Sequence, residues 1–478
     1  MSYKTAIASM FALGHELTNT PSQKFDLAAM RVLLAALGNP ERRFPSVLIA
    51  GTNGKGSTAA TLASILRASG YRTGLYTSPH LLRINERIRV DGTEIADDDF
   101  AELHGKVDRA AERLVEQGQL PWHPSFFEMM TAIGFEHFAQ EAVELAVLEV
   151  GMGGRLDATN VVEPEVSVIT DIALDHEKFL GNTVGEIAGE KVGIIRPGGV
   201  VVTLPQQPEA NDVIGNTVLE LGARVTSAVP YVPPVSPASS QYLVPSPECR
   251  VPNVGEDQAL DTEIAVGTTN SAEKHARGYI YRYPMQVLGK QILVETALVG
   301  RHQLRNVALA IATAKELSDR GSSGITADSI ERGIRETRWP GRFQVIPARA
   351  GAPEIVMDVA HNPAGAWALR AALSAQYEDR PLIFVFGAMR DKAISEMAEI
   401  LFPLAERVLA VQAENPRSAS PEEIREAAKR SSTEIETAEN VASALDRARR
   451  LSKPETVVVI TGSIYVVGEA MRSFGTKV

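Results

Sequence analysis

The stretch Ser46–Ser69, SVLIAGTNGKGSTAATLASILRAS, decides the fold of this chain. It opens with a short apolar run, Ser46–Ala50, which indicates a buried strand. It closes with Thr58–Ser69, whose Ala and Leu content is typical of a helix. The loop between them contains three glycines and a lysine. A strand, a glycine-rich loop and a helix in this order bind phosphate, because backbone amides and the helix N-terminus attract an anion.

The loop is therefore predicted to bind the phosphates of a nucleotide. Lys55 is expected to reach the outer phosphates, and the hydroxyl of Ser57 or Thr58 to reach Mg²⁺. The loop departs from the common G-x-x-x-x-G-K-[ST] form, because Ile49 and Gly56 stand where Gly and Ser or Thr are usual. The predicted nucleotide-binding residues of the loop are Gly51, Thr52, Asn53, Gly54, Lys55, Gly56, Ser57 and Thr58.

Apolar runs alternate with helical segments along the rest of the chain, which predicts an α/β protein with parallel sheets. We expect a P-loop parallel-sheet ATP-binding domain over residues 1–297 and a smaller Rossmann-like α/β domain over 298–478. Residues 229–278, which are rich in proline, are predicted to form an insertion, and Tyr279–Glu295 to form a strand pair. The other predicted strands are Val143–Val150, Val166–Ile172, Val200–Leu204, Glu354–Val359, Leu382–Phe386, Arg407–Val411 and Thr456–Ile460.

The composition excludes several classes of protein. A net charge of −11 argues against a dedicated nucleic-acid or anionic-membrane binder, and no apolar run reaches the roughly 18 residues of a membrane span. The single cysteine, Cys249, excludes an intrachain disulfide, a cysteine zinc site and an iron–sulfur cluster. A cytoplasmic location is expected. The spacing of Ala6, Met10 and Leu13 favours an amphipathic first helix over a signal peptide.

Two further strands end in acidic residues or histidine. Glu149 follows one buried run, and Asp175 with His176 follows the next. The carboxyl ends of parallel strands meet at one edge of a sheet, where α/β proteins bind ligands, and a carboxylate there suits Mg²⁺. The nearby Gly151–Gly154 run imitates a dinucleotide motif, but Leu156 occupies the position that needs Gly or Ala, so nicotinamide binding is rejected.

The chain resembles the dihydrofolate synthase/folylpolyglutamate synthase family of the Mur-ligase superfamily, whose motifs it carries in order over most of its length. In the first half these are Leu37–Pro40, the loop Gly51–Thr58, Thr77–Leu81, Asn85–Ile88, Phe126–Glu128, Glu149–Asn160, Asp175-His176 and Glu190–Ile194. In the second half they are His302-Gln303 with Asn306, Trp339–Arg342, Asp358 with His361–Pro363, and Ser463–Tyr465. The chain departs at Val359, where the family commonly has Gly.

The resemblance implies two Mg²⁺ sites and a modified lysine. The implied metal ligands are Ser57, Ser78, Glu149, His176 and Lys191. In the family the lysine matching Lys191 is carbamylated by CO₂, which turns a cation into an anion. From the residues alone Lys191 reads as a surface helix lysine paired with Glu190 or Glu186. The assignment of His176 also rests on the family pattern, because Mg²⁺ prefers oxygen to imidazole.

The resemblance also implies the substrate contacts. On the folate side they are Ser78, His80, Asn85, Arg87, Phe127 and Asp157. From the residues alone, Phe127 also suits core packing and Asp157 a turn. The implied nucleotide contacts in the second half are Asn306, Arg342 and Asp358, and the implied glutamate-side residues are His361 and Ser463. His361 is the candidate base, so Lys55, Lys191 and His361 are the expected catalytic side chains.

The implied activity is an ATP-dependent carbon–nitrogen ligase. A substrate carboxylate attacks the γ-phosphate to give an acyl phosphate, and the amine of L-glutamate then displaces phosphate. The first substrate is dihydropteroate or a reduced folate, and we expect both additions from a monomer whose domains close around ATP. The alternatives are another Mur-type amino-acid ligase, a P-loop nucleotide hydrolase acting as a switch, and a catalytically silent binding protein.

Overall fold

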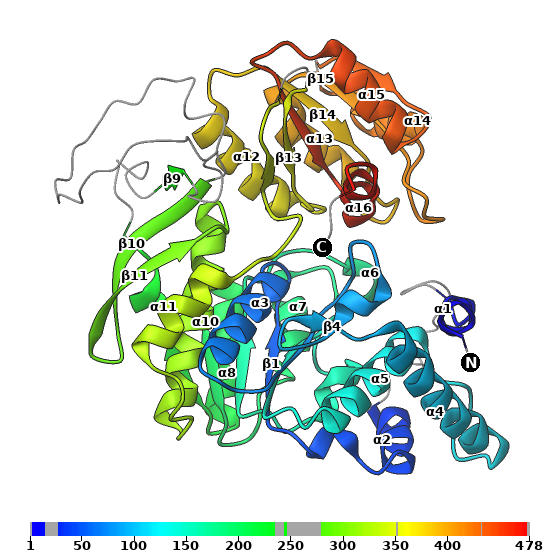
Figure 1. Cartoon of the computed structure of the whole chain (residues 1–478), viewed down its shortest axis with the longest axis vertical. Helices are drawn as coiled ribbons and strands as arrows, with labels where there is room; N and C mark the ends of the chain where they lie inside the picture. Colours follow the sequence, from blue (N-terminus) through cyan, green and yellow to red (C-terminus); the bar gives the residue numbers. More distant parts are fainter. Residues whose placement is uncertain are drawn as a thin grey trace, which may run out of the picture.

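The computed structural model describes residues 2–14, 27–234, 243–245, 279–349, 352–431 and 433–475. Figure 1 shows two bodies stacked along the long axis, the lower built mainly from the first two thirds of the chain and the upper from its last third. Most of the predicted insertion at 229–278, including Cys249, lies outside the described residues. The N-terminal helix, the strand pair and the two sheets all lie within them.

The described part of the lower body contains an eight-stranded sheet, parallel except for its first two strands. In order across the sheet the strands are β4 (Thr93–Glu94), β3 (Ile88–Val90), β2 (Thr73–Tyr76), β5 (Leu145–Glu149), β1 (Ser46–Ala50), β6 (Val166–Ile169), β7 (Val200–Thr203) and β8 (Arg224–Ser227). The five residues of β1 are all buried, as the continuous apolar run predicts for a strand covered on both faces. β1 lies between β5 and β6, so the loops after these three strands meet at one edge.

Helices cover both faces of this sheet. Its helices are α1 (Tyr3–Ala12), α2 (Leu27–Ala36), α3 (Lys55–Ala68), α4 (Asp97–Glu116), α5 (Phe126–Gln140), α6 (Glu177–Leu180), α7 (Val184–Val192), α8 (Pro208–Glu220), α10 (Arg301–Asp319) and α11 (Ala327–Glu336). Successive side chains of β1 point to opposite faces of the sheet. Val47 and Ile49 pack with α3, α10 and α11, whereas Leu48 and Ala50 pack with α2, α4 and α5.

The upper body contains a six-stranded sheet among the described residues. Its strands in order are β12 (Gln344–Ile346), β13 (Glu354–Met357), β17 (Val457–Thr461), β14 (Leu382–Phe386), β15 (Ala405–Ala410) and β16 (Ile435–Thr437). Only β12 runs antiparallel to its neighbour. The helices of this body are α12 (Pro363–Tyr377), α13 (Ile394–Leu401), α14 (Pro421–Ala427), α15 (Val441–Leu451) and α16 (Ile464–Ser473).

The division between the bodies differs from the boundary predicted at 297/298. α10 and α11 both follow that boundary, yet both pack on α3 of the lower sheet. Figure 1 shows them in the lower body, beside the small sheet formed by β9 (Leu243–Pro245), β10 (Tyr279–Val287) and β11 (Lys290–Thr296). The second sheet begins only at β12, so the physical boundary lies between α11 and β12. The packing of α10 and α11 on α3 joins segments more than 200 residues apart, which no local pattern in the sequence shows.

Local signals explain the element ends near the site. α3 begins at Lys55, three residues before the predicted Thr58, because Gly54 adopts a left-handed φ of 88° and ends the loop early. A Cβ at position 54 would overlap the Oδ1 atom of Asn306, so the loop and α10 meet at a glycine. Every helix in the described ranges is too short or too polar to cross a membrane.

Candidate active site

The ATP loop is held in place by the segment after β6. The backbone N–H groups of Thr52 and Asn53 donate to the carbonyl oxygen of Asp171, at 2.8 and 3.2 Å. The Thr52 hydroxyl donates to the Ala173 carbonyl at 3.0 Å. Arg305 of α10 forms an ion pair with the Asp171 carboxylate, with 2.6 Å between Nη2 and Oδ1. The loop is therefore anchored to the sheet and to α10 before any nucleotide binds.

Two lysines from different elements converge on one carbonyl oxygen of this loop. The Nζ of Lys55 lies 3.0 Å from the oxygen of Gly51, and the Nζ of Lys191 lies 2.9 Å from the same atom. Lys191 lies on α7 and is buried, so the interpretation as a surface helix lysine is wrong. Burial together with the Lys55 charge lowers the pKa of Lys191 to about 7. A substantial fraction of this amine is therefore neutral at physiological pH.

A buried carboxylate faces the same loop. Glu149, at the carboxyl end of β5, accepts a hydrogen bond from the Ser78 backbone N–H at 3.1 Å. Burial raises the pKa of Glu149 to about 7, although Lys55 and Arg342 oppose the shift. The carboxylate thus sits among cations but lacks the solvation that would keep it ionised, and a divalent cation would supply that stabilisation.

The residues predicted to bind metal fall into two sets with different fits to Mg²⁺. Ser57, Ser78 and Glu149 offer oxygen donors, and Gly56, which has no side chain, lets the loop approach the Glu149 carboxylate closely, so this set fits. His176 and Lys191 do not fit in the arrangement described, because the His176 Nε2 faces the Lys392 ammonium at 3.5 Å and Lys191 donates to Gly51. No cluster of three His, Cys, Asp or Glu ligands occurs among the described residues.

Replacing Gly56 tests whether the close approach of the loop to Glu149 matters for catalysis. A Cβ at position 56 would lie 3.0 Å from the Trp339 ring and 3.3 Å from the Glu149 Oε2. We expect Gly56→Ala to lower kcat about 10- to 100-fold with little change in thermal stability, because displacement of a charged group by a few tenths of an ångström disrupts catalytic geometry. ADP release and thermal melting measure the two effects.

Gly215→Ala is the matched control, because position 215 lies on α8 and a Cβ there would meet no atom within 4 Å. This variant should keep full activity. Equal activities of the two variants would contradict a role for the close approach of the loop to Glu149.

A cavity of about 430 Å³ extends between the two bodies, and its wall includes Ser78, which contacts Glu149. From the lower body its wall includes Ser78, Phe127, Asp157 and His176, and from the upper body Arg342, His361 and Ser463. Both bodies therefore contribute predicted site residues to one space, whose size is typical of small-molecule sites. Sequence reasoning missed the apolar part of the wall, which includes Met30, Phe126, Met152, Leu156, Phe179 and Leu180.

Phe127 and Asp157 define the lower wall. The Phe127 ring covers Gly151 so closely that a Cβ at position 151 would overlap it. Asp157 caps the turn that follows, accepting from the backbone N–H of Thr159 and of Met152, each at 3.0 Å. Burial raises the pKa of Asp157. Asp157 thus forms a turn, as the simpler interpretation expects, and also lines the cavity.

Three predicted substrate residues are not in the described wall of the cavity. Asn85 donates to the Ile95 carbonyl at 2.7 Å and to Asp97 at 3.1 Å, and accepts from the Tyr3 hydroxyl. The Nε of Arg87 donates to the Nδ1 of His80 at 2.9 Å. The Arg87 guanidinium lies 5.3 Å from the centre of the Phe126 ring. Arg87 therefore supports the wall behind Phe126, and direct contact of the three side chains with substrate remains a prediction.

The polar groups of two predicted nucleotide residues outside the loop, Asp358 and Asn306, and of the candidate base His361 are partly engaged in hydrogen bonds. The Asp358 carboxylate accepts from the backbone N–H of Phe343 at 2.8 Å and of Ala360 at 2.9 Å. Asn306, at the Gly54 contact, donates to the Gln303 side chain at 2.9 Å. His361 donates its Nδ1–H to the Val359 carbonyl at 2.9 Å, which leaves Nε2 as the acceptor.

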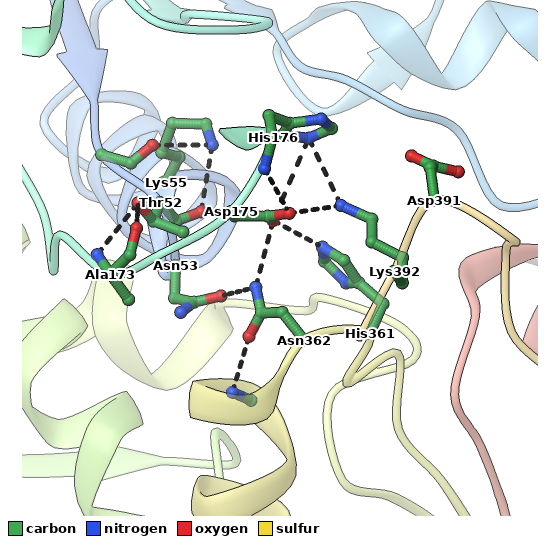
Figure 2. A network of polar contacts seen from close by, with 12 residues as sticks. Thr52, Asn53, Lys55, Ala173, Asp175, His176, His361, Asn362, Asp391 and Lys392 are labelled. Atoms are coloured by element: carbon green, nitrogen blue, oxygen red, sulfur yellow. Dashed lines mark hydrogen bonds and ion pairs between the residues drawn. The ribbon is translucent and has the colours of Figure 1, made fainter. Parts of the chain in front are cut away.

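Figure 2 shows a network that sequence reasoning missed, in which groups from both bodies meet at Asp175. Asp175 lies 2.6 Å from the Lys392 Nζ and 3.2 Å from the Asn362 Nδ2. Burial alone would raise the pKa of Asp175, but the charges of His176, Lys392 and His361 lower this pKa below its usual range. Burial, with the Lys392 charge adding to it, lowers the pKa of His176 and of His361 to about 4, so both imidazoles are neutral at pH 7.

The neutrality of His361 bears on its predicted role as a base. Its Nε2 is free of a proton, as a base requires, but a pKa near 4 makes it a weak acceptor for a proton from an ammonium group. A signal for Lys392 did exist, since it follows the buried strand β14 by six residues, at the carboxyl edge where ligands bind.

The phosphate loop, buried carboxylate and facing second sheet define an ATP-dependent ligase of the Mur type, and residues 341–464 match the family described as Mur ligase, glutamate ligase domain. Folylpolyglutamate synthase of Lacticaseibacillus casei is 36% identical over 441 residues, covering 92% of each chain. Dihydrofolate synthase/folylpolyglutamate synthase of Bacillus subtilis is 32% identical over 450 residues, covering 93% of this chain and 94% of its own. The chain belongs to the dihydrofolate synthase/folylpolyglutamate synthase family.

A solved structure supports the same fold. Mycobacterium tuberculosis folylpolyglutamate synthase complexed with ADP superposes with a TM-score of 0.79 at 32% identity, covering 99% of each chain. The predicted α/β fold with a Mur-type second sheet is confirmed. The ligase prediction is also confirmed, and the alternatives of another Mur-type ligase and of a nucleotide-hydrolysing switch lose their support.

Proposed function

We propose that this enzyme adds L-glutamate both to dihydropteroate and to the glutamate tail of reduced folates. The observation that carries the proposal is the cavity between the two bodies, which joins an aromatic and apolar lower wall to an upper wall that contains Arg342. Ser78 in this wall donates its backbone N–H to Glu149. Phe127 and its neighbours offer stacking faces for a pterin ring. Arg342 offers positive charge for a carboxylate. The names of the relatives cover both additions.

The chemistry follows from where the charges lie. The substrate carboxylate attacks the γ-phosphate of ATP, ADP leaves, and the acyl phosphate is then attacked by the glutamate amine with release of phosphate. Lys55, on α3, positions and neutralises the phosphates once it leaves the carbonyls of Gly51 and Thr52. Arg342, in the cavity wall, orients the anion that forms at the acyl group.

Mg²⁺ is proposed at the oxygen set of Ser57, Ser78 and Glu149, where it would neutralise charge on the phosphates. The proposal of a second ion at His176 and Lys191 requires Lys191 in its carbamylated form, and we retain it in that form only. The raised pKa of Glu149 implies that metal affinity grows as pH rises through about 7, because only the ionised carboxylate binds a cation.

Carbamylation of Lys191 is supported by its lowered pKa. CO₂ adds only to a neutral amine, forming an N–C bond and releasing a proton, and a pKa near 7 makes far more neutral amine than an ordinary lysine has. We expect Lys191→Ala to lose about 100-fold or more in kcat and to recover part of it with acetate, which replaces the missing carboxylate.

Lys55→Ala is the control for rescue, because Lys55 acts as a cation and acetate cannot replace it. Steady-state ADP release with and without acetate measures both variants. Full activity of Lys191→Ala without acetate would contradict the carbamate.

The substrate proposal is tested by ADP release with dihydropteroate plus glutamate, compared with tetrahydrofolate plus glutamate. We expect both pairs to stimulate ADP release well above the rate with ATP alone. Stimulation by one pair only would restrict the enzyme to a single addition, and stimulation by neither would overturn the proposed function.

A further inference from the structure

Lys392 forms a buried ion pair between the two bodies. It lies in the loop between β14 and α13 of the upper body, while Asp175 follows β6 of the lower body. The Nζ of Lys392 lies 2.6 Å from the Asp175 Oδ1, and the two side chains are only 8% and 9% exposed. Figure 2 shows the lysine extended toward Asp175. A buried ion pair between two bodies favours the arrangement in which they contact each other over one in which they are apart.

The contacts around this pair continue to the ATP loop. The Nδ2 of Asn362 donates to the Asp175 Oδ2 at 3.2 Å and to the Asn53 Oδ1 at 3.0 Å. The Oδ1 of Asn362 caps α12 by accepting from the Gly365 N–H at 2.8 Å. One path of polar contacts therefore runs from Lys392 through Asp175 and Asn362 to Asn53, with α12 fixed at its side.

Lys392 places its ammonium charge against the Asp175 carboxylate, which otherwise accepts from uncharged donors, the His176 backbone N–H at 2.8 Å and the Asn362 amide. The imidazoles of His176 and His361 also face Asp175, at 3.9 and 3.8 Å, and neither is placed for a strong hydrogen bond. The neighbouring carboxylate, Asp391, bonds Arg417 at 2.8 Å instead. Removing one partner of a buried pair leaves the other charge without compensation, so the bodies would separate to hydrate it.

We propose that Lys392 is a positioning residue, a latch that holds the upper body closed on the ATP loop. In the closed arrangement Arg342, His361 and Ser463 face the cavity, and Asn362 contacts the loop. The latch deepens the proposed function, because closure brings the upper-body groups to the acyl phosphate and the incoming amine. It acts through Asp175 and Asn362 and does not itself take part in bond making.

The test measures closure and turnover separately. Small-angle X-ray scattering of the full chain with ADP and Mg²⁺ should give Lys392→Met a larger radius of gyration than the unaltered protein. Its kcat should fall at least about tenfold, within what removing one partner of a buried ion pair can cost. Lys429→Met is the matched control, because Lys429 lies in the same body, 67% exposed and paired with Glu426. The control should match the unaltered protein in both measurements.

Two further variants keep the test decisive if Lys392→Met folds poorly. Lys392→Arg retains the cation and should restore most of the closure. Combining Lys392→Met with Asp175→Asn removes both charges, so it should fold and should open no further than Lys392→Met alone. An unchanged radius of gyration in both the Met variant and this combination would overturn the latch. Opening in an enzyme that fails to ligate glutamate would overturn the proposed function and leave the latch standing.

Discussion

Replacing Lys55 by alanine is expected to lower kcat/KM for ATP about 1,000-fold, because it removes the cation that the ATP loop presents to the transferring phosphoryl group. The fold should survive. The loop is held by the Asp171 carbonyl through the amides of Thr52 and Asn53, and these bonds do not involve the lysine side chain. The thermal midpoint should therefore change little, while ADP release collapses.

Exposed Lys453 provides the control for this variant, since it lies in the loop before β17 of the upper body. Lys453→Ala should retain full activity. If Lys55→Ala kept a kcat/KM within about threefold of the unaltered enzyme, the loop would not be the site of phosphoryl transfer.

Replacing Glu149 by glutamine is expected to lower kcat at fixed Mg²⁺ about 100-fold, because the carboxylate is the anionic ligand of the proposed metal site. The variant is nearly isosteric. Its amide oxygen can still accept the Ser78 N–H that Glu149 accepts at 3.1 Å, so the local structure should persist. A titration of Mg²⁺ at constant ATP measures the effect, and excess Mg²⁺ should recover part of the activity.

The pH dependence distinguishes this loss from a packing defect. Because burial raises the pKa of Glu149 to about 7, the unaltered enzyme should need more Mg²⁺ below pH 7, by up to about tenfold per unit. The requirement should level off above pH 7, where the carboxylate is ionised. Glu149→Gln should show a flat Mg²⁺ requirement from pH 6 to 8. A Mg²⁺ requirement that rises with pH in the unaltered enzyme would contradict the metal site.

Much of the site could be predicted because it follows from local patterns. The loop Gly51–Thr58 and the strand-end residue Glu149 lie close to elements that an apolar run or a glycine identifies, and parallel strands bring their ends together. Lys191 came only from the family motifs, because its own pattern indicates a surface lysine. The ordered family motifs then supplied the upper-body residues Arg342 and His361, which no local pattern would pair with the loop.

What could not be predicted depends on packing between distant segments. The place of Lys392 after β14 marks only the edge of the sheet, and the docking of the upper body is what places it against Asp175. The contacts of Asn85 with Tyr3 and Asp97 likewise join segments that lie far apart or on separate elements, and no local pattern shows them. The packing of α10 in the lower body could not be predicted because its partner α3 lies more than 200 residues earlier.

Isotope transfer tests the central claim most directly, because the claim is that ATP activates a pteroate or folate carboxylate as an acyl phosphate. Substrate whose carboxylate carries ¹⁸O is incubated with ATP, Mg²⁺, glutamate and the enzyme, and the released inorganic phosphate is examined by mass spectrometry. Attack of that carboxylate on the γ-phosphate predicts one ¹⁸O atom in the phosphate for each amide formed. Phosphate without the label, or ADP release that continues unchanged without the pterin substrate, would contradict the account.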